Sequence, residues 1–184
     1  METPSERTEP PSDTLLVAIA GPKAFVRVVG RGSFKVGPAL KKFGTAAVDK
    51  GCREFVIDMG PCLAMDSTFM GVLAGLGMRL KREFNGRVTL CRLSAKNQAL
   101  LRTLGLDRIV AMSTAAEESA AAAPDKMARL DTPDVGRKAT AETIIEAHEN
   151  LIDLSPENLP KFRDVLAYLK EDLQSTDDSG EGVR

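Results

Sequence analysis

Three consecutive residues carry the clearest chemical potential in this sequence: Asp66, Ser67 and Thr68. Side chains of these types accept hydrogen bonds from the free backbone N–H groups at a helix start. That end of a helix also favours negative charge, because its N–H groups and dipole are both positive. Ser67 could therefore carry a phosphate, which adds about −1.5 to −2 charges at neutral pH. The alternative is a helix cap with no further role.

The segments on either side must position these three residues. Upstream, the apolar run 55–59 contains a single charge, Asp58, and predicts a strand that is buried on both faces. Gly60-Pro61 ends that strand, and residues 62–65 are predicted to form a loop. Downstream, apolar residues recur close to every 3.6 positions, which predicts a helix. They are Phe69, Met70, Leu73, Leu76, Leu80 and Phe84.

The run 65–73, MDSTFMGVL, resembles the signature of the STAS domain, the fold of bacterial anti-sigma-factor antagonists. The resemblance extends over roughly residues 15–112 in the order of the elements. In that family the serine of an Asp-Ser pair is the phosphoacceptor for a partner kinase, and the resemblance implies this role for Ser67. The family usually has glycine two positions after the serine, whereas this chain has Phe69.

The resemblance also implies partners. Unphosphorylated Ser67 would lie in an interface with a serine kinase that also holds a sigma factor, phosphorylation would end the binding, and a phosphatase would be a further partner. The implied partner-binding residues are Asp66, Thr68, Phe69, Met70, Ser33 and Phe34. Ser33 is either a second hydroxyl at this surface or only a turn residue. The alternative function is a scaffold that never switches and assembles with itself, for example as a homodimer, or within a larger complex.

Strands and helices are expected in the order hairpin, helix, strand, helix, strand, helix, strand. Strands joined through helices pair in parallel, so the sequence predicts an α/β fold with a mixed sheet, as in the STAS sandwich. Strands are predicted over 15–20, 24–29, 55–59, 87–93 and 109–111. The predicted organisation is a disordered leader over 1–13, a STAS-like domain over 14–112, a linker over 113–138, a helical hairpin over 139–173 and a disordered tail over 174–184.

Gly71 and Gly75 lie one turn apart in the predicted helix after Ser67. Glycine inside a helix costs up to about 1 kcal/mol relative to alanine, so the pair predicts close packing of this helix on the sheet.

Charge is unevenly distributed along the chain. Residues 21–112 contain 16 Lys and Arg against 6 Asp and Glu, whereas residues 113–184 contain 8 against 16. Either the basic body meets an acidic partner, or the acidic C-terminal part folds back on the body and restrains its partner-binding face.

Several function classes find no support in the sequence. No Ser/His/Asp set, phosphate-binding glycine loop or cluster at metal-ligand spacing is evident, so we expect no enzyme, cofactor or metal. The sole histidine, His148, is expected in the core or an interface. A candidate basic patch lacks aromatic platforms, which argues against nucleic acid; its members are Lys81, Arg82, Arg87 and Arg92. No apolar run is long enough for a membrane, and three cysteines without a CxxC pair indicate reduced thiols in the cytoplasm.

Overall fold

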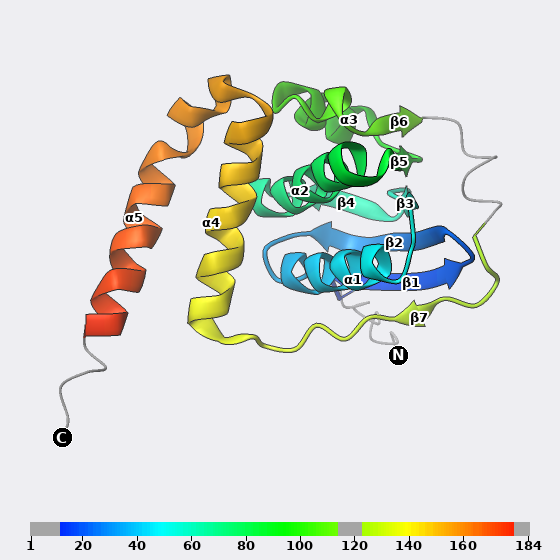
Figure 1. The fold of residues 1–184 in the computed structure, drawn as a ribbon, viewed down its shortest axis with the longest axis horizontal. Helices are drawn as coiled ribbons and strands as arrows, with labels where there is room; N and C mark the ends of the chain where they lie inside the picture. The colour runs from blue at the N-terminus through cyan, green and yellow to red at the C-terminus, as the bar shows by residue number, and fades with distance from the viewer. Residues whose placement is uncertain (1–11, 114–122, 179–184) are drawn as a thin grey trace, which may run out of the picture.

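The computed structural model describes residues 12–113 and 123–178, and it contains one mixed sheet of seven strands (Figure 1). The main path of the sheet has the order β6-β5-β3-β2-β1-β7. β1 is antiparallel to β2 and β7, while β2–β3, β3–β5 and β5–β6 pair in parallel. The strands are β1 Thr14–Ala20, β2 Lys23–Gly32, β3 Glu54–Asp58, β4 Cys62–Met65, β5 Arg87–Cys91, β6 Ala111–Ser113 and β7 Ala128–Arg129. The predicted mixed α/β fold is confirmed.

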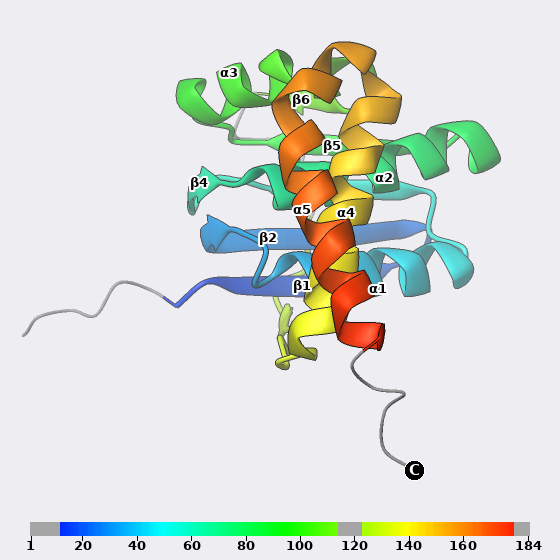
Figure 2. The ribbon, with the colours of Figure 1, turned by 90° about the vertical axis from the view of Figure 1, so that its left-hand side faces the viewer.

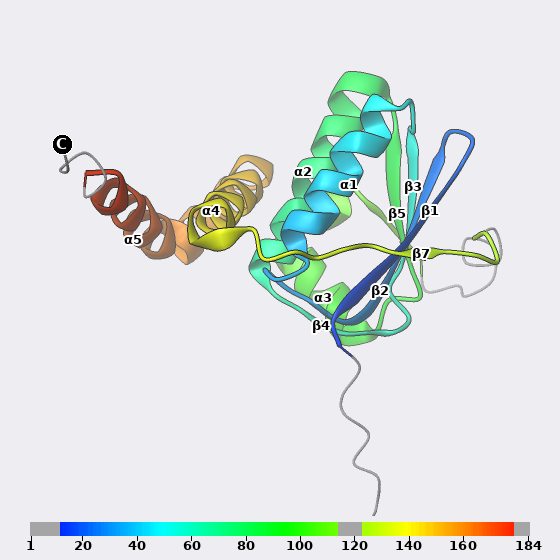
Figure 3. The same ribbon diagram turned by 90° about the horizontal axis from the view of Figure 1, so that it is seen from below.

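The helices form layers on one side of the sheet. α1 and α2 cover a face of the sheet, α4 crosses α2, and α5 packs against α4 on the side away from the sheet (Figures 2 and 3). The helical elements are α1 Gly37–Asp49, α2 Ser67–Phe84, α3 Ala95–Thr103, η1 Leu106–Arg108, α4 Gly136–Leu154, η2 Pro156–Asn158 and α5 Leu159–Asp178. The C-terminal hairpin is thus part of the folded body.

Alternation along the strands defines the core. In β3, Phe55 and Ile57 are fully buried, whereas Val56 between them is only half-buried. Asp58, on the same face as Val56, is 5% exposed, so the prediction that this strand is buried on both faces is confirmed except at Glu54 and Val56, which are only partly buried. The strand side chains that face the helices pack with α1 and α2 in one hydrophobic cluster. It includes Leu15, Val26, Phe55, Ile57 and Val88 of the strands, Leu40 of α1 and Leu73 of α2.

Several predicted boundaries are corrected by strand pairing. Residues 62–65, expected as a loop, form β4, because the end of β2 extends through Gly32 and offers them a parallel partner. The last strand, predicted over 109–111, is β6 and begins only at Ala111, because Ile109 and Val110 connect it to η1. The predicted linker contains β7, and α5 continues to Asp178, so the predicted tail is helical up to that residue. The remaining tail, and the leader up to residue 11, lie outside the described residues.

The single charge of β3, Asp58, joins three segments of the sheet. Its carboxylate accepts hydrogen bonds from Arg27 Nε at 2.8 Å, Arg92 Nε at 2.7 Å and the Gly60 backbone N–H at 3.0 Å. Only 7% of the Asp58 side chain is exposed. Burial alone would raise the pKa of Asp58, but the hydrogen bonds from Arg92, Gly60 and Arg27 outweigh it and hold the pKa below its usual value.

We predict that Asp58→Asn lowers the free energy of unfolding by about 2–3 kcal/mol, because two arginines lose their charged acceptor. Urea denaturation measures the change. Glu54→Gln is the matched control, since Glu54 pairs with Arg87 in a more exposed position and its loss should cost less than about 1 kcal/mol. The Asp58 contribution is complete above the ordinary aspartate pKa of about 3.9 and is lost as pH falls through the lower folded value. Equal losses in the two variants would contradict the assignment.

Candidate functional site

Ser67 is the first residue of α2, and Asp66 is the residue that caps this helix. The two Asp66 carboxylate oxygens have separate tasks. Oδ1 accepts the Phe69 backbone N–H at 2.9 Å, and Oδ2 accepts the Phe34 backbone N–H at 2.7 Å. The cap therefore fixes the start of α2 to the loop that follows β2. This confirms the predicted helix start and places the Ser67 hydroxyl at its N-terminal end.

Ser33 and Phe34 lie beside Asp66 and line one hollow with it. The Ser33 carbonyl accepts the backbone N–H groups of Val36 and Gly37 at 3.1 and 2.9 Å, which forms the turn into α1. Its hydroxyl oxygen is buried and has no hydrogen-bond partner among the described residues. Phe34 is 43% exposed. The structure thus brings together Ser33, Phe34 and Asp66 next to Ser67, and their role in partner binding stays a prediction.

Thr68, Phe69 and Met70 do not present their side chains to a partner. They are 5%, 0% and 5% exposed, respectively. Phe69 points into the core, where its ring lies so close to Gly32 that a Cβ there would be 2.6 Å from it. These three side chains are buried in this conformation, and their predicted contact with a partner stays a prediction. Phe69, where the family pattern has glycine, is therefore not part of the outer surface.

A residue of the C-terminal hairpin completes the site. His148 of α4 has its Nε2 2.8 Å from the Ser67 hydroxyl oxygen and its Nδ1 2.9 Å from the Ile144 carbonyl. A carbonyl can only accept, so Nδ1 carries the proton and Nε2 of the neutral ring accepts the Ser67 hydroxyl. The ring is 4% exposed and lies against Phe162 of α5, with 4.6 Å between ring centroids.

The protonation of His148 follows from this environment. Burial lowers the pKa of His148, against smaller opposing effects of the Ile144 carbonyl and the Asp66 carboxylate. The imidazole is therefore neutral at physiological pH. The expectation that His148 lies in the core or an interface agrees with its position, but nothing in the sequence pointed to Ser67 as its partner.

Two glycines of α2 accommodate α4. A Cβ at Gly71 would lie 2.1 Å from the Ala147 carbonyl oxygen, and one at Gly75 would lie 2.5 Å from Asn150 Nδ2. The close packing predicted from these glycines exists, but it is against α4 and not against the sheet. The glycine spacing was the one sequence signal that a helix crosses α2 at this place.

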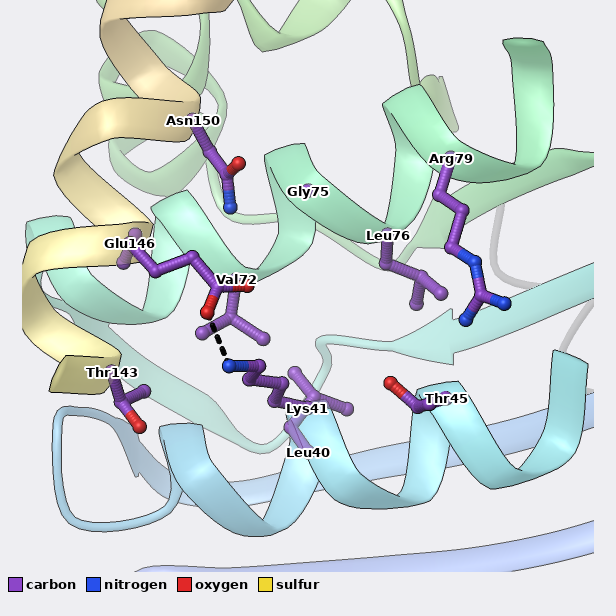
Figure 4. A pocket seen from close by; sticks show the side chains of 12 residues that line it. Leu40, Lys41, Thr45, Val72, Gly75, Leu76, Arg79, Thr143, Glu146 and Asn150 are labelled. Atoms are coloured by element: carbon purple, nitrogen blue, oxygen red, sulfur yellow. Dashed lines mark hydrogen bonds and ion pairs between the residues drawn. The ribbon is translucent and has the colours of Figure 1, made fainter. Parts of the chain in front are cut away.

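A small hollow lies beside this crossing, between α1, α2 and α4 (Figure 4). Its volume of about 140 Å³ is below the 300–1,000 Å³ of ordinary small-molecule sites. An ion pair between Lys41 and Glu146 crosses it and joins α1 to α4. The hollow is a gap at a helix junction, with aliphatic walls from Leu40, Val72 and Leu76.

The Ser67–His148 pair has the geometry in which a histidine activates a serine nucleophile. One feature opposes such a role: Ser67 is partly buried where α4 crosses α2. Among the described residues no group of three or more His, Cys, Asp or Glu is placed to hold a metal ion.

Three of the four members of the predicted basic patch make structural contacts. Arg92 binds Asp58, Arg87 pairs with Glu54, and Lys81 donates to the Arg108 carbonyl. No helix within residues 12–113 or 123–178 has the length and apolarity needed to cross a membrane.

No family model and no curated protein matches this sequence. Solved structures do resemble the fold. A Thermotoga maritima protein assigned as an anti-sigma-factor antagonist superposes with a TM-score of 0.51 at 18% identity, over 57% of this chain and 90% of its own. The anti-sigma-factor antagonist SpoIIAA in its unphosphorylated form gives 0.48 at 20% identity, over 59% and 94%. Its phosphorylated form, described as a Bacillus cell fate determinant, gives 0.48 at 20%, over 59% and 96%.

The chain has the STAS fold. The fold that the sequence resemblance implied is therefore confirmed. More than two-fifths of this chain has no counterpart in the Thermotoga protein.

We predict that the pKa of His148 lies below 6.5 in the folded chain. Because this histidine is the only one, proton NMR of its ring reports the titration without assignment. The urea-unfolded chain is the internal control and should titrate near about 6.5. Packing of α4 on α2 is then fully favourable above pH 6.5 or so and weakens as pH falls through the lower folded value. A folded-state pKa at or above the unfolded one would contradict the buried, neutral ring.

Proposed function

We propose that this protein is an anti-sigma-factor antagonist, a cytoplasmic interaction switch whose phosphoacceptor is Ser67. The observation that carries the proposal is the position of Ser67: a hydroxyl at the N-terminal end of α2, held by the Asp66 cap, in a STAS fold. The MDSTFMGVL run supports it independently, since its resemblance to the family signature was evident from sequence. The fold by itself does not specify a function.

In the proposed reaction a serine-kinase anti-sigma factor transfers the γ-phosphoryl group of ATP to Ser67. A bond forms between Ser67 Oγ and phosphorus, the bond from phosphorus to the β-phosphate oxygen breaks, and the hydroxyl proton passes to a base of the kinase. The backbone N–H groups at the start of α2 tolerate the new charge, so the fold survives it. A phosphatase would restore the hydroxyl by hydrolysis.

Binding would change because the partner meets a different surface. Unphosphorylated Ser67 carries a neutral hydroxyl, and Phe34 and Lys35 are exposed on the adjacent loop. Phosphate adds a charge of about −1.5 to −2 next to the Asp66 carboxylate, and a partner shaped for a hydroxyl must then desolvate or repel it. Release of the sigma factor would accompany binding of the unphosphorylated protein.

A non-switching scaffold is the second candidate. Helix α5 exposes Leu159, Val165 and Tyr168 by 48%, 37% and 67%. Apolar side chains of this size on a helix can mediate assembly. A mass that rises with protein concentration and is unchanged by Ser67→Asp would favour this function over the switch.

We predict that Ser67→Asp reduces co-purification of a serine-kinase anti-sigma factor by about tenfold or more, because a charge replaces the hydroxyl at the interface. Tagged wild-type and variant chains are recovered from native cells, and bound proteins and Ser67 phosphate are quantified by mass spectrometry. Ser94→Asp is the matched control: Ser94 caps α3, aspartate can replace it as a cap, and the same charge is added elsewhere.

Ser67 occupancy that changes between stressed and unstressed growth is the expected companion result. If Ser67 carries no phosphate in either condition and Ser67→Asp retains every partner, the switch is refuted and the scaffold takes its place.

A further inference from the structure

The hairpin of α4 and α5 lies over the first turns of α2, where Ser67 is located (Figures 1 and 2). We propose that this hairpin is an intramolecular ligand of the Ser67 surface, and that it withholds Ser67 from a kinase or partner until it lifts. The regulatory meaning rests on the proposed function of Ser67, whereas the cover itself can be tested without it.

The first support is the contact with the hydroxyl itself. His148 accepts the Ser67 O–H at 2.8 Å, and Phe162 of α5 lies against the imidazole. Both helices of the hairpin therefore contribute to the cover. A partner that needs the Ser67 hydroxyl must first break its bond to His148.

The second support is a groove on α2 that fits this helix. Gly71 allows the Ala147 backbone to lie directly on α2, and Asn150 Nδ2 donates to the Gly71 carbonyl at 3.3 Å. Glycine is unfavourable in a helix interior, so an uncovered helix would gain from alanine at position 71. The sequence of α2 is thus adapted to an occupant, and the occupant seated there is α4.

The third support is charge complementarity between the hairpin and the body. Glu146 of α4 forms an ion pair with Lys41 of α1. Asp153 of α4 lines a second hollow together with Lys81 and Arg82 of α2. The acidic C-terminal part of the sequence therefore faces part of the basic body, which agrees with the second interpretation of the uneven charge.

The turn of the hairpin is anchored separately. Asn158 is 1% exposed and donates to the carbonyls of Leu104 and Leu151 at 3.0 and 2.8 Å, and Lys161 donates to the Thr103 carbonyl at 3.2 Å. These bonds hold the far end of α4 to the corner after α3. The hairpin thus contacts the body along its length and not only at Ser67.

The geometry gives the cover two states. A Ser67 oxygen 2.8 Å from Nε2 leaves no room between these two atoms for a phosphorus atom and three further oxygens. A kinase would therefore act on the open form, and phosphorylated Ser67 could not form its hydrogen bond to His148 again. Phosphorylation of Ser67 would therefore favour the open form, in which the hairpin does not contact the start of α2.

The test replaces Ser67 by cysteine in the full-length chain and measures the rate of labelling by a bulky maleimide. The three native cysteines are buried, so the wild-type chain gives the background rate. Ala147→Glu in the Ser67→Cys chain places a charge in the α2–α4 interface and should speed labelling about tenfold or more. Ala167→Glu, the same change at an exposed position of α5, should leave the rate of the Ser67→Cys chain unchanged.

A second opening variant guards against loss of the fold. Glu146→Lys sets a cation against Lys41 and should also speed labelling, while circular dichroism shows that the body stays folded. Equal rates in the folded Ser67→Cys chain with and without these changes would overturn the proposal. A second outcome would also overturn the proposal: the slow-labelling Ser67→Cys chain is a dimer in solution and both opening variants are monomers. The hairpin of a second copy would then cover Ser67.

The regulatory arm uses the native Ser67. Ala147→Glu should co-purify several times more kinase than Ala167→Glu from the same cells. If the opening variants speed labelling of Cys at position 67 but neither Ala147→Glu nor Ala167→Glu co-purifies a kinase, the intramolecular contact is supported and the proposed function is refuted. Kinase bound equally by both variants would refute the regulation.

Discussion

The close approach of α2 and α4 is the constraint on which the functional half of this structure depends. It exists because Gly71 has no side chain, so that the Ala147 carbonyl can lie where a Cβ would otherwise be. That backbone contact sets the distance between the two helices. At this distance the His148 ring reaches Ser67, and Phe162 reaches His148 from the other side. A wider separation would leave the hydroxyl in solvent and the imidazole without its partner.

Local signals in the sequence were sufficient for most of the fold. Asp66 was recognisable as the start of a helix because a cap is a short-range hydrogen bond. The pairing of β4 with the end of β2 was not recognisable, since it depends on a neighbour about thirty residues away. Val56, which is only partly buried, likewise shows that an apolar run does not reveal how completely each face of a strand is covered.

The candidate site was predictable only where its parts are close in sequence or in the family pattern. Ser67, Asp66, Ser33 and Phe34 were found in this way. Periodicity showed that Phe69 and Met70 belong to an apolar helix face, but it could not decide between core and partner surface, and packing against Gly32 placed Phe69 in the core. His148 is 81 positions from Ser67, and no local rule connects a lone histidine with a distant hydroxyl.

The short strand β7 has a consequence for how strongly the hairpin must bind. β7 pairs with β1, so the chain is fixed to the body at Arg129, and only residues 130–135 separate that point from the start of α4. Such a tether gives the hairpin an effective concentration of about millimolar at its own groove. A contact with weak intrinsic affinity is therefore mostly formed. An external partner displaces the hairpin only when the ratio of its concentration to its dissociation constant exceeds the same ratio for the tethered hairpin. The pairing of β7 with β1 thus allows a weak and quickly reversible contact to keep α2 covered.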